Sequence, residues 1–305
     1  MERLFQKRTA FLLVFLIIVW GVNWPLSKFA LSYTPPLLFA GIRTLIGGFL
    51  LLLIAIPRYK KIRLKDTWHI YLISSLFNII LFYGLQTVGL GYLPAGLFSV
   101  IVFLQPVLLS IFAWLWLGEA MFKGKVFGLF LGFAGVATVS IKGLSGDLSV
   151  IGIILALSCA VSWAIGTVIV KKAGNRVDSI WLTTIQLIVG GLFMTVIGSK
   201  VENWSSIVWS APYLLDLAFI SVFVIAAGWL VFFHLVNSGD ASKVASYTFF
   251  IPFVALVTSI LFFNEPFTVY LLIGLILIVM SIALVNAKPK LLRKPIKAGA
   301  NHAKL

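Results

Sequence analysis

Several polar side chains stand inside long apolar stretches, where each needs a partner or a ligand. Arg43 lies about seven residues into one such stretch, roughly 10 Å from its end at ~1.5 Å per residue. A guanidinium at that depth must face protein or water, and its paired donors suit a carboxylate or a phosphate. The alternative is a lock that holds one conformation by binding backbone carbonyls or helix ends. Both interpretations stay open.

Two tryptophans, Trp20 and Trp163, lie deep inside apolar stretches. An indole N–H there needs a partner, so we expect both rings to form opposite walls for an apolar or aromatic group. Asn23 follows Trp20 by three residues and shares its helix face, and Thr167 follows Trp163 by four and extends the second wall. The alternative for both rings is ordinary packing between helices.

Two prolines, Pro106 and Pro252, also lie within apolar stretches, and Gln105 precedes the first. Proline removes a backbone hydrogen bond and frees a carbonyl one turn earlier. Irregular backbone at membrane depth is tolerated where it lines a cavity or is buried in protein. We therefore expect helix kinks at both prolines in substrate-facing helices, with a static kink as the alternative.

Other candidates for the same cavity are weaker. Tyr83 and Gln86 lie three residues apart and share a helix face. Trp229 occupies the place of Tyr83 in the second half of the chain, and Tyr247 is a candidate gate near the inner end of its stretch. Packing is the alternative role for each of them.

Acidic residues are scarce in these stretches. Glu119 and Glu265 end their helices, so we expect them to cap a neighbouring helix or to pair with lysine. No aspartate or glutamate stands out at mid-membrane, which leaves Arg43 without an acidic neighbour at depth. The sequence therefore indicates no proton relay and leaves energy coupling open.

The apolar stretches define the fold class. The chain is 61% hydrophobic, against about 45–50% in soluble proteins. The apolar stretches, whose residue ranges are given below, are long enough to cross a ~30 Å hydrocarbon core as helices. We predict an all-α integral membrane protein with ten transmembrane helices and no soluble domain. The expected spans are 11–30, 37–56, 69–90, 95–117, 125–141, 150–170, 180–199, 213–237, 243–263 and 267–286.

The chain contains an internal repeat. Residues 20–28 return 143 positions later as residues 163–171, each segment opening with tryptophan and closing with lysine. Ala95, Pro106 and Glu119 return at an offset of 146, as Ala241, Pro252 and Glu265. Each copy holds five expected spans, an odd number, so the second copy enters the membrane in the opposite orientation. We predict two inverted five-helix repeats, at 1–143 and 144–290, and a basic tail at 291–305.

The net charge of +15 is distributed unevenly. With the N-terminus placed inside, 20 of the 24 Lys and Arg lie on the inner side and three on the outer, while Arg43 is intramembrane. This asymmetry follows the positive-inside rule and places both termini in the cytoplasm. The basic residues suit anionic membrane lipid, and we expect no nucleic-acid partner.

The sequence lacks the motifs that are typical of other functional classes. The sequence has no Walker A motif, no His/Cys cluster with metal-ligand spacing and no catalytic Ser-His-Asp arrangement. We expect no cofactor and no enzyme activity, although a membrane-embedded enzyme or a scaffold subunit without transport activity remains the alternative. Gly128, Gly132 and Gly135 share a helix face that suits packing within the chain or a homodimer contact.

The motifs together resemble a known family. Trp20-Gly21-x-Asn23 before Lys28, Pro36-x-x-x-Ala40-x-x-Arg43, and Ala95-Gly96 followed by Gln105-Pro106 and Leu117-Gly118-Glu119 are similar to the EamA family of the drug/metabolite transporter superfamily. The second copy departs from this pattern, because Gln186 replaces Arg43 and Asn264 replaces Gly118.

The resemblance implies a central cavity lined mainly by the first four helices of each repeat, with the fifth and tenth helices peripheral. It also implies transport of small organic metabolites, often amino acids and often outward. We therefore predict a secondary plasma-membrane transporter of amino acids or related carboxylates. It would export its small-molecule substrate by alternating access.

Overall fold

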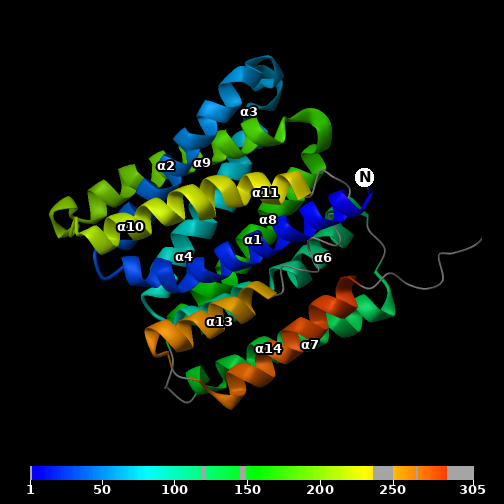
Figure 1. The fold of residues 1–305 in the computed structure, drawn as a ribbon. Helices are drawn as coiled ribbons and strands as arrows, with labels where there is room; N and C mark the ends of the chain where they lie inside the picture. Colours follow the sequence, from blue (N-terminus) through cyan, green and yellow to red (C-terminus); the bar gives the residue numbers. More distant parts are fainter. Residues whose placement is uncertain (1, 119–120, 145–148, 236–249, 266, 287–305) are drawn as a thin grey trace, which may run out of the picture.

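The computed structural model of the chain describes residues 2–118, 121–144, 149–235, 250–265 and 267–286. Within these ranges the chain is helical and contains no strand (Figure 1). Seven of the described helical segments are long and apolar enough to cross a membrane. Two further helices, α13 (Phe250–Phe263) and α14 (Val269–Asn286), are also apolar, but their apolar parts are shorter. The chain is therefore an all-helical, multi-pass membrane protein.

Most of the expected spans fall on single helices or continuous helical runs in the described residues, and the fourth is divided between two helices. The first half contains α1 (Glu2–Ala30), α2 (Pro36–Ala55), α3 (Leu64–Ser75), α4 (Phe82–Leu90), α5 (Ala95–Val102), α6 (Gln105–Leu117) and α7 (Lys123–Leu144). The second half contains α8 (Val150–Ala173), α9 (Ser179–Val201), α10 (Ala211–Phe219) and α11 (Gly228–Leu235), followed by α13 and α14. Short 3-10 turns occupy Ile56–Lys61, Gly174–Arg176 and Trp204–Ser206.

Two π-helical segments occur at matched places in the two halves. Leu76–Leu81 joins α3 to α4, and Ile220–Ala227 joins α10 to α11. A π-helical turn widens the helix and is common at functional sites. In both halves the segment ends just before the aromatic residues Tyr83 and Trp229. Neither π-helical segment was expected from the sequence.

The fourth expected span is interrupted where a kink was predicted. α5 ends at Val102 and α6 begins at Gln105, so Pro106 stands in the first turn of a new helix, where its missing N–H costs little. Pro252 lies in the first turn of the described part of α13, and the residues before Phe250 lie outside the described ranges.

The repeat-related helices α2 and α9 lie side by side and run antiparallel (Figure 1). Gly41 of α2 faces Thr195 of α9, and Gly48, further along α2, faces the earlier residue Ile188. Because the numbering falls on α9 as it rises on α2, the two helices run in opposite directions. Glycine on both helices allows their backbones to approach closely.

The glycine face predicted on the fifth span is occupied within the chain. Gly132 of α7 faces Ser281 of α14, Gly135 faces Ile278, and Ser281 donates a hydrogen bond to the carbonyl of Gly128. This pairing is also antiparallel, and Figure 1 shows the two helices together at one edge of the molecule. The prediction of intrachain packing is therefore confirmed.

The replacement of Gly118 by Asn264 in the second repeat preserves backbone geometry. Gly118 caps α6 with φ of 68°, and Asn264 follows α13 with φ of 52°. Asparagine is the non-glycine residue that best tolerates left-handed backbone. The departure from the pattern therefore maintains the same turn.

Candidate functional site

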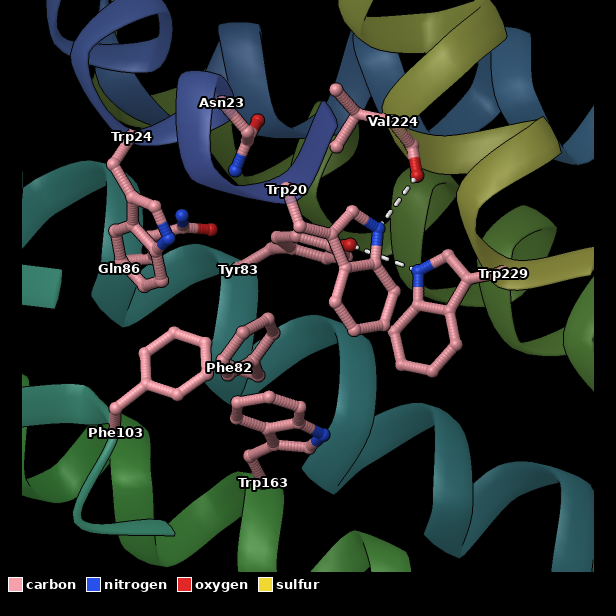
Figure 2. Close-up of a pocket in the computed structure, with 10 residues that line it drawn as sticks. All are labelled: Trp20, Asn23, Trp24, Phe82, Tyr83, Gln86, Phe103, Trp163, Val224 and Trp229. Carbon is pink, nitrogen blue, oxygen red and sulfur yellow. Dashed lines mark hydrogen bonds between the residues drawn. The ribbon is translucent and has the colours of Figure 1, made fainter. Parts of the chain in front are cut away.

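A cavity lies at the centre of the bundle, between the two halves of the chain. About 350 Å³ of atom-free space lies among its lining residues, and part of that space is open to the surroundings. Seven of its ten lining residues are aromatic, and α1, α4 and α8 contribute most of them (Figure 2). The lining residues are Trp20, Asn23, Trp24, Phe82, Tyr83, Gln86, Phe103, Trp163, Val224 and Trp229.

Residues that correspond between the repeats meet in this cavity. The rings of Trp20 and Trp163 contact edge to face, with centroids 6.4 Å apart and an interplanar angle of 73°. The Trp229 indole donates a hydrogen bond to the Tyr83 hydroxyl at 2.9 Å. The Trp20 indole donates to the carbonyl of Val224 at 3.3 Å. The two predicted tryptophan rings are therefore in contact with each other. In the Trp20–Trp163 and Tyr83–Trp229 contacts, each repeat contributes one ring.

Trp163 is at the centre of the aromatic lining. The centroids of Phe82 and Phe103 lie 5.1 Å and 5.7 Å from its ring. Unlike Trp20 and Trp229, the indoles of Trp163 and Trp24 donate no hydrogen bond to any residue in the described ranges. A buried indole N–H usually finds a partner, so these two donors remain available to a bound molecule.

Arg43 lies behind the cavity wall and does not line the cavity. Its side chain is fully buried, with Nη1 donating to Ser27 Oγ at 2.7 Å and Nη2 to Gln86 Oε1 at 3.3 Å. Its guanidinium carbon lies 4.7 Å from the Phe39 ring centroid and 4.9 Å from that of Tyr83. The arginine joins three helices through side chains, which matches a lock more closely than a direct ligand.

This network orients the two amides of the cavity. Ser27 Oγ donates to Asn23 Oδ1 at 3.1 Å, while Gln86 Oε1 accepts from Arg43. Because both amide oxygens are engaged by the arginine network, each amide has its NH2 group left for other partners. Gln86 Nε2 is buried and has no hydrogen bond partner. The wall therefore offers hydrogen bond donors to acceptor groups of a ligand.

The other expected site residues lie outside the lining. Gln105 Nε2 donates to Thr167 Oγ1 at 3.4 Å, and Thr167 donates to the backbone carbonyl of Trp163, so these bonds join α6 to α8 outside the cavity lining. Gln186 Oε1 accepts from Asn78 at 3.2 Å between α9 and the π-helical segment before α4. Tyr247 lies outside the described ranges.

One buried acid was missed. The expectation that Arg43 has no acidic neighbour at depth was wrong, because Asp216 of α10 is buried and interacts electrostatically with it. Asp216 lies close to the beginning of the expected span 213–237. A carboxylate at such a position is normally interpreted as a residue at the membrane boundary. The buried positions Tyr213, Asp216, Leu217 and Ile220 follow a helical period, which is the signal that could have found it.

The predicted capping role of Glu265 is confirmed. Its carboxylate accepts hydrogen bonds from the backbone of Ala95 at 2.6 Å and Gly96 at 3.0 Å, at the start of α5. It also pairs with Lys28 Nζ at 3.4 Å. Glu202, which the sequence analysis did not select, caps the start of α2 in the same way. Glu119 lies outside the described ranges.

The comparison with protein families identifies the chain. The model of the EamA-like transporter family matches it twice, at residues 7–141 and 150–287. The chain belongs to the EamA-like transporter family. Its EamA relatives include an uncharacterised transporter, YvbV, of Bacillus subtilis (strain 168), which is 64% identical over 290 residues covering 95% of each chain.

More distant proteins show similarity over nearly the full length. A probable amino-acid metabolite efflux pump of Escherichia coli (strain K12) is 24% identical, covering 97% of this chain and 100% of its own. A protein of known crystal structure, 17% identical, superposes with a TM-score of 0.65 over 91% of this chain and 96% of its own. This superposition shows that the two chains share a fold.

Proposed function

We propose that this EamA family member is a secondary transporter that binds its substrate in the aromatic cavity and exposes it to each side of the membrane in turn. The observation that carries the proposal is that repeat-related residues, Trp20 with Trp163 and Tyr83 with Trp229, contact each other around one cavity. Relative movement of the two repeats would therefore reshape the site itself.

The packing of repeat-related helices supports an inverted architecture. α2 and α9 correspond in the two copies and run antiparallel, and so do α7 and α14. Two copies of opposite membrane orientation produce this relationship. The proposed topology has ten spans in two five-helix repeats, at 1–143 and 144–290, with both termini and the basic tail on the cytoplasmic side of the plasma membrane.

The cavity chemistry supports a substrate with two distinct parts. The rings of Trp20, Trp163 and Trp229 suit an apolar or aromatic group. The NH2 groups of Asn23 and Gln86 and the indole of Trp163 suit an acceptor such as a carboxylate. Arg43 acts on that carboxylate through the two amides, so we assign it a positioning role. Amino acids and related carboxylates combine both parts.

Export is the direction we propose for this transport. The E. coli relative named a probable amino-acid metabolite efflux pump covers 97% of this chain. That name supports both amino-acid substrates and outward movement. The remaining partners we propose are membrane lipid and a second copy of the chain, which would need a surface other than the glycine face of α7 because α14 covers it.

The test is counterflow in proteoliposomes. Vesicles loaded with an unlabelled compound are diluted into its radiolabelled form, and the panel contains phenylalanine, leucine, phenylalaninamide, phenethylamine, succinate and glucose 6-phosphate. We expect phenylalanine or leucine to exchange above the protein-free background and phenylalaninamide, which lacks the carboxylate, to exchange at least about tenfold less. That factor is about 1.4 kcal/mol.

Two outcomes would contradict the proposal. Equal exchange of the acid and its amide would remove the carboxylate from recognition. Background flux for the whole panel, from protein that elutes as a single folded species, would argue against metabolite transport and favour a scaffold or enzyme role.

A further inference from the structure

Asp216 is a buried carboxylate without a hydrogen bond. The residue is 6% exposed, and neither Oδ1 nor Oδ2 has a partner among the described residues. An ionised carboxylate in apolar surroundings is costly unless donors or an opposite charge compensate it. The carboxylate is not used by the cavity described above, because Asp216 is absent from its lining.

Asp216 and Arg43 lie at similar depths on facing helices. Gly47 of α2 packs against Ile225 and the carbonyl of Ser221, in the π-helical segment that continues α10. Arg43 lies one turn before Gly47, and Asp216 lies about one turn before Ser221. Their electrostatic interaction follows from this placement.

The two groups are close enough to interact but do not form an ion pair. The described ranges contain two ion pairs within 4 Å, and neither includes Asp216. Arg43 is held instead by Ser27 and Gln86, while its Nε has no partner. Each side of this potential pair therefore has unused hydrogen-bonding atoms.

Few other titratable groups in the part of the chain that the structure describes face Asp216. Tyr213 on its own helix interacts with it, and Tyr33, after α1, stacks on Tyr213 with centroids 6.1 Å apart. Lys28, which is the titratable side chain at this end of α1, is engaged by Leu93 and Glu265. Among the described residues, Arg43 is therefore the cation that can balance an ionised Asp216.

We propose that Asp216 is a proton-binding site linked to the substrate cavity by Arg43. With Asp216 protonated, Arg43 binds Ser27 and Gln86 and orients the cavity amides, as in this structure. When the proton leaves to water, the carboxylate attracts Arg43 away from those partners and changes the wall that the substrate meets. Proton and substrate binding are then reciprocally coupled. The coupling role rests on the proposed transport function, but proton binding does not.

A proton fits this site better than a metal ion. The site offers one carboxylate with a guanidinium nearby, whose positive charge opposes a sodium or divalent cation. Hard cations also require several oxygen ligands. A proton needs one oxygen and neutralises the carboxylate.

The test measures protonation without a substrate. The purified full-length protein is treated with dicyclohexylcarbodiimide, an apolar reagent that adds to protonated carboxyl groups. The carboxyl oxygen bonds to the central carbon of the reagent, the acid proton moves to a reagent nitrogen, and an acyl shift gives a stable N-acylurea. Peptide mass spectrometry locates the product across a pH series. We expect a label on Asp216 that declines as pH rises and is absent from Asp216→Asn.

Glu265 and Glu202 are internal comparisons in the same sample. Both accept two backbone hydrogen bonds, which stabilise the ionised form, so we expect each to carry at least about tenfold less label than Asp216. Native protein that is unlabelled at Asp216 at every pH, when detergent-unfolded protein is labelled there, would overturn the proposal.

Two variants test the link to Arg43 with opposite signs. Arg43→Gln removes the cation that favours the ionised acid, so the label should persist to higher pH. Ser27→Ala removes one partner of Arg43 and frees the cation to approach Asp216, so the label should decline at lower pH. If Arg43→Gln does not fold, Ser27→Ala alone still tests the link, because it leaves the Arg43 cation in place and removes only one of its partners. A pH profile that neither variant moves would overturn the link, and labelling with no flux would leave the proton site standing while the transport proposal fails.

Discussion

The indole nitrogen of Trp229 lies 2.9 Å from the hydroxyl of Tyr83, to which it donates a hydrogen bond across 146 residues of sequence. That separation equals the offset at which Ala95, Pro106 and Glu119 recur. The bond therefore joins corresponding positions of the two repeats inside the cavity. Two π-helical segments, at Leu76–Leu81 and Ile220–Ala227, precede these residues and contribute to their placement.

We expect the Tyr83–Trp229 bond to be energetically coupled. Tyr83→Phe removes the acceptor, and Trp229→Phe removes the donor. Coupling energies of this kind in membrane proteins average about 0.6 kcal/mol and reach about 1.7. A double-mutant cycle on the free energy of unfolding should give a value in this range. Additive effects of the two substitutions would show that the bond does not form.

Gln86 should affect substrate affinity more than Gln105 does. Gln86→Leu removes a cavity donor and a partner of Arg43, whereas Gln105 bonds Thr167 outside the lining. Loss of a hydrogen bond to a charged group costs about 1.5–3 kcal/mol, or roughly 10- to 150-fold. The counterflow KM for the best carboxylate substrate should rise by this factor in Gln86→Leu and change less than about threefold in Gln105→Leu. The reverse order would place the binding site near Gln105.

The α2–α9 seam should not tolerate an added methyl group at Gly41. A Cβ at Gly41 would lie 2.7 Å from the backbone nitrogen of Thr195, whereas a Cβ at Gly84 of α4 would meet only Met194 Sδ, at 3.9 Å. Overpacking costs about 1–3 kcal/mol. We expect Gly41→Ala to lower the melting temperature and Gly84→Ala to leave it unchanged or raised. Equal melting temperatures would contradict the close approach of α2 and α9.

The left-handed turns at Gly118 and Asn264 should accept exchange of their residues. Gly118→Asn and Asn264→Gly retain residue types that adopt positive φ, so each should change the free energy of unfolding by less than about 1 kcal/mol. Asn264→Val places a β-branched residue there and should cost about 1–2 kcal/mol. Chemical unfolding of the three variants distinguishes these outcomes. Similar losses in all three would mean that side-chain contacts dominate over backbone conformation.

Repetition explains why part of the cavity could be predicted. Trp20 and Trp163 were selected as counterparts in the two copies, and Trp229 as the counterpart of Tyr83, which shares a helix face with Gln86; all four aromatic residues line the cavity. Trp24, Phe82 and Phe103 were missed because a single aromatic in an apolar span is usually packing. The π-helical segments, which rotate the residues that follow them, leave no signal in the apolar pattern.

Arg43 and Asp216 show where sequence reasoning was insufficient. The depth of Arg43 correctly indicated a buried functional group, but whether it faces the cavity or supports the wall depends on its contacts with Ser27 and Gln86. Asp216 lies close to the beginning of its expected span, and at such a position hydropathy cannot distinguish a residue at the membrane boundary from a buried one. The packing of the π-helical segment after α10 against α2 decides its environment.

The most direct test of the central claim is counterflow in paired tryptophan variants. Trp163→Ala removes the ring at the centre of the cavity, and Trp181→Ala removes an equally buried ring that instead donates to the carbonyl of Arg58. If the aromatic cavity binds the substrate, Trp163→Ala should reduce kcat/KM for the best carboxylate at least about tenfold, and folded Trp181→Ala should retain it. Unchanged transport in folded Trp163→Ala would contradict the account.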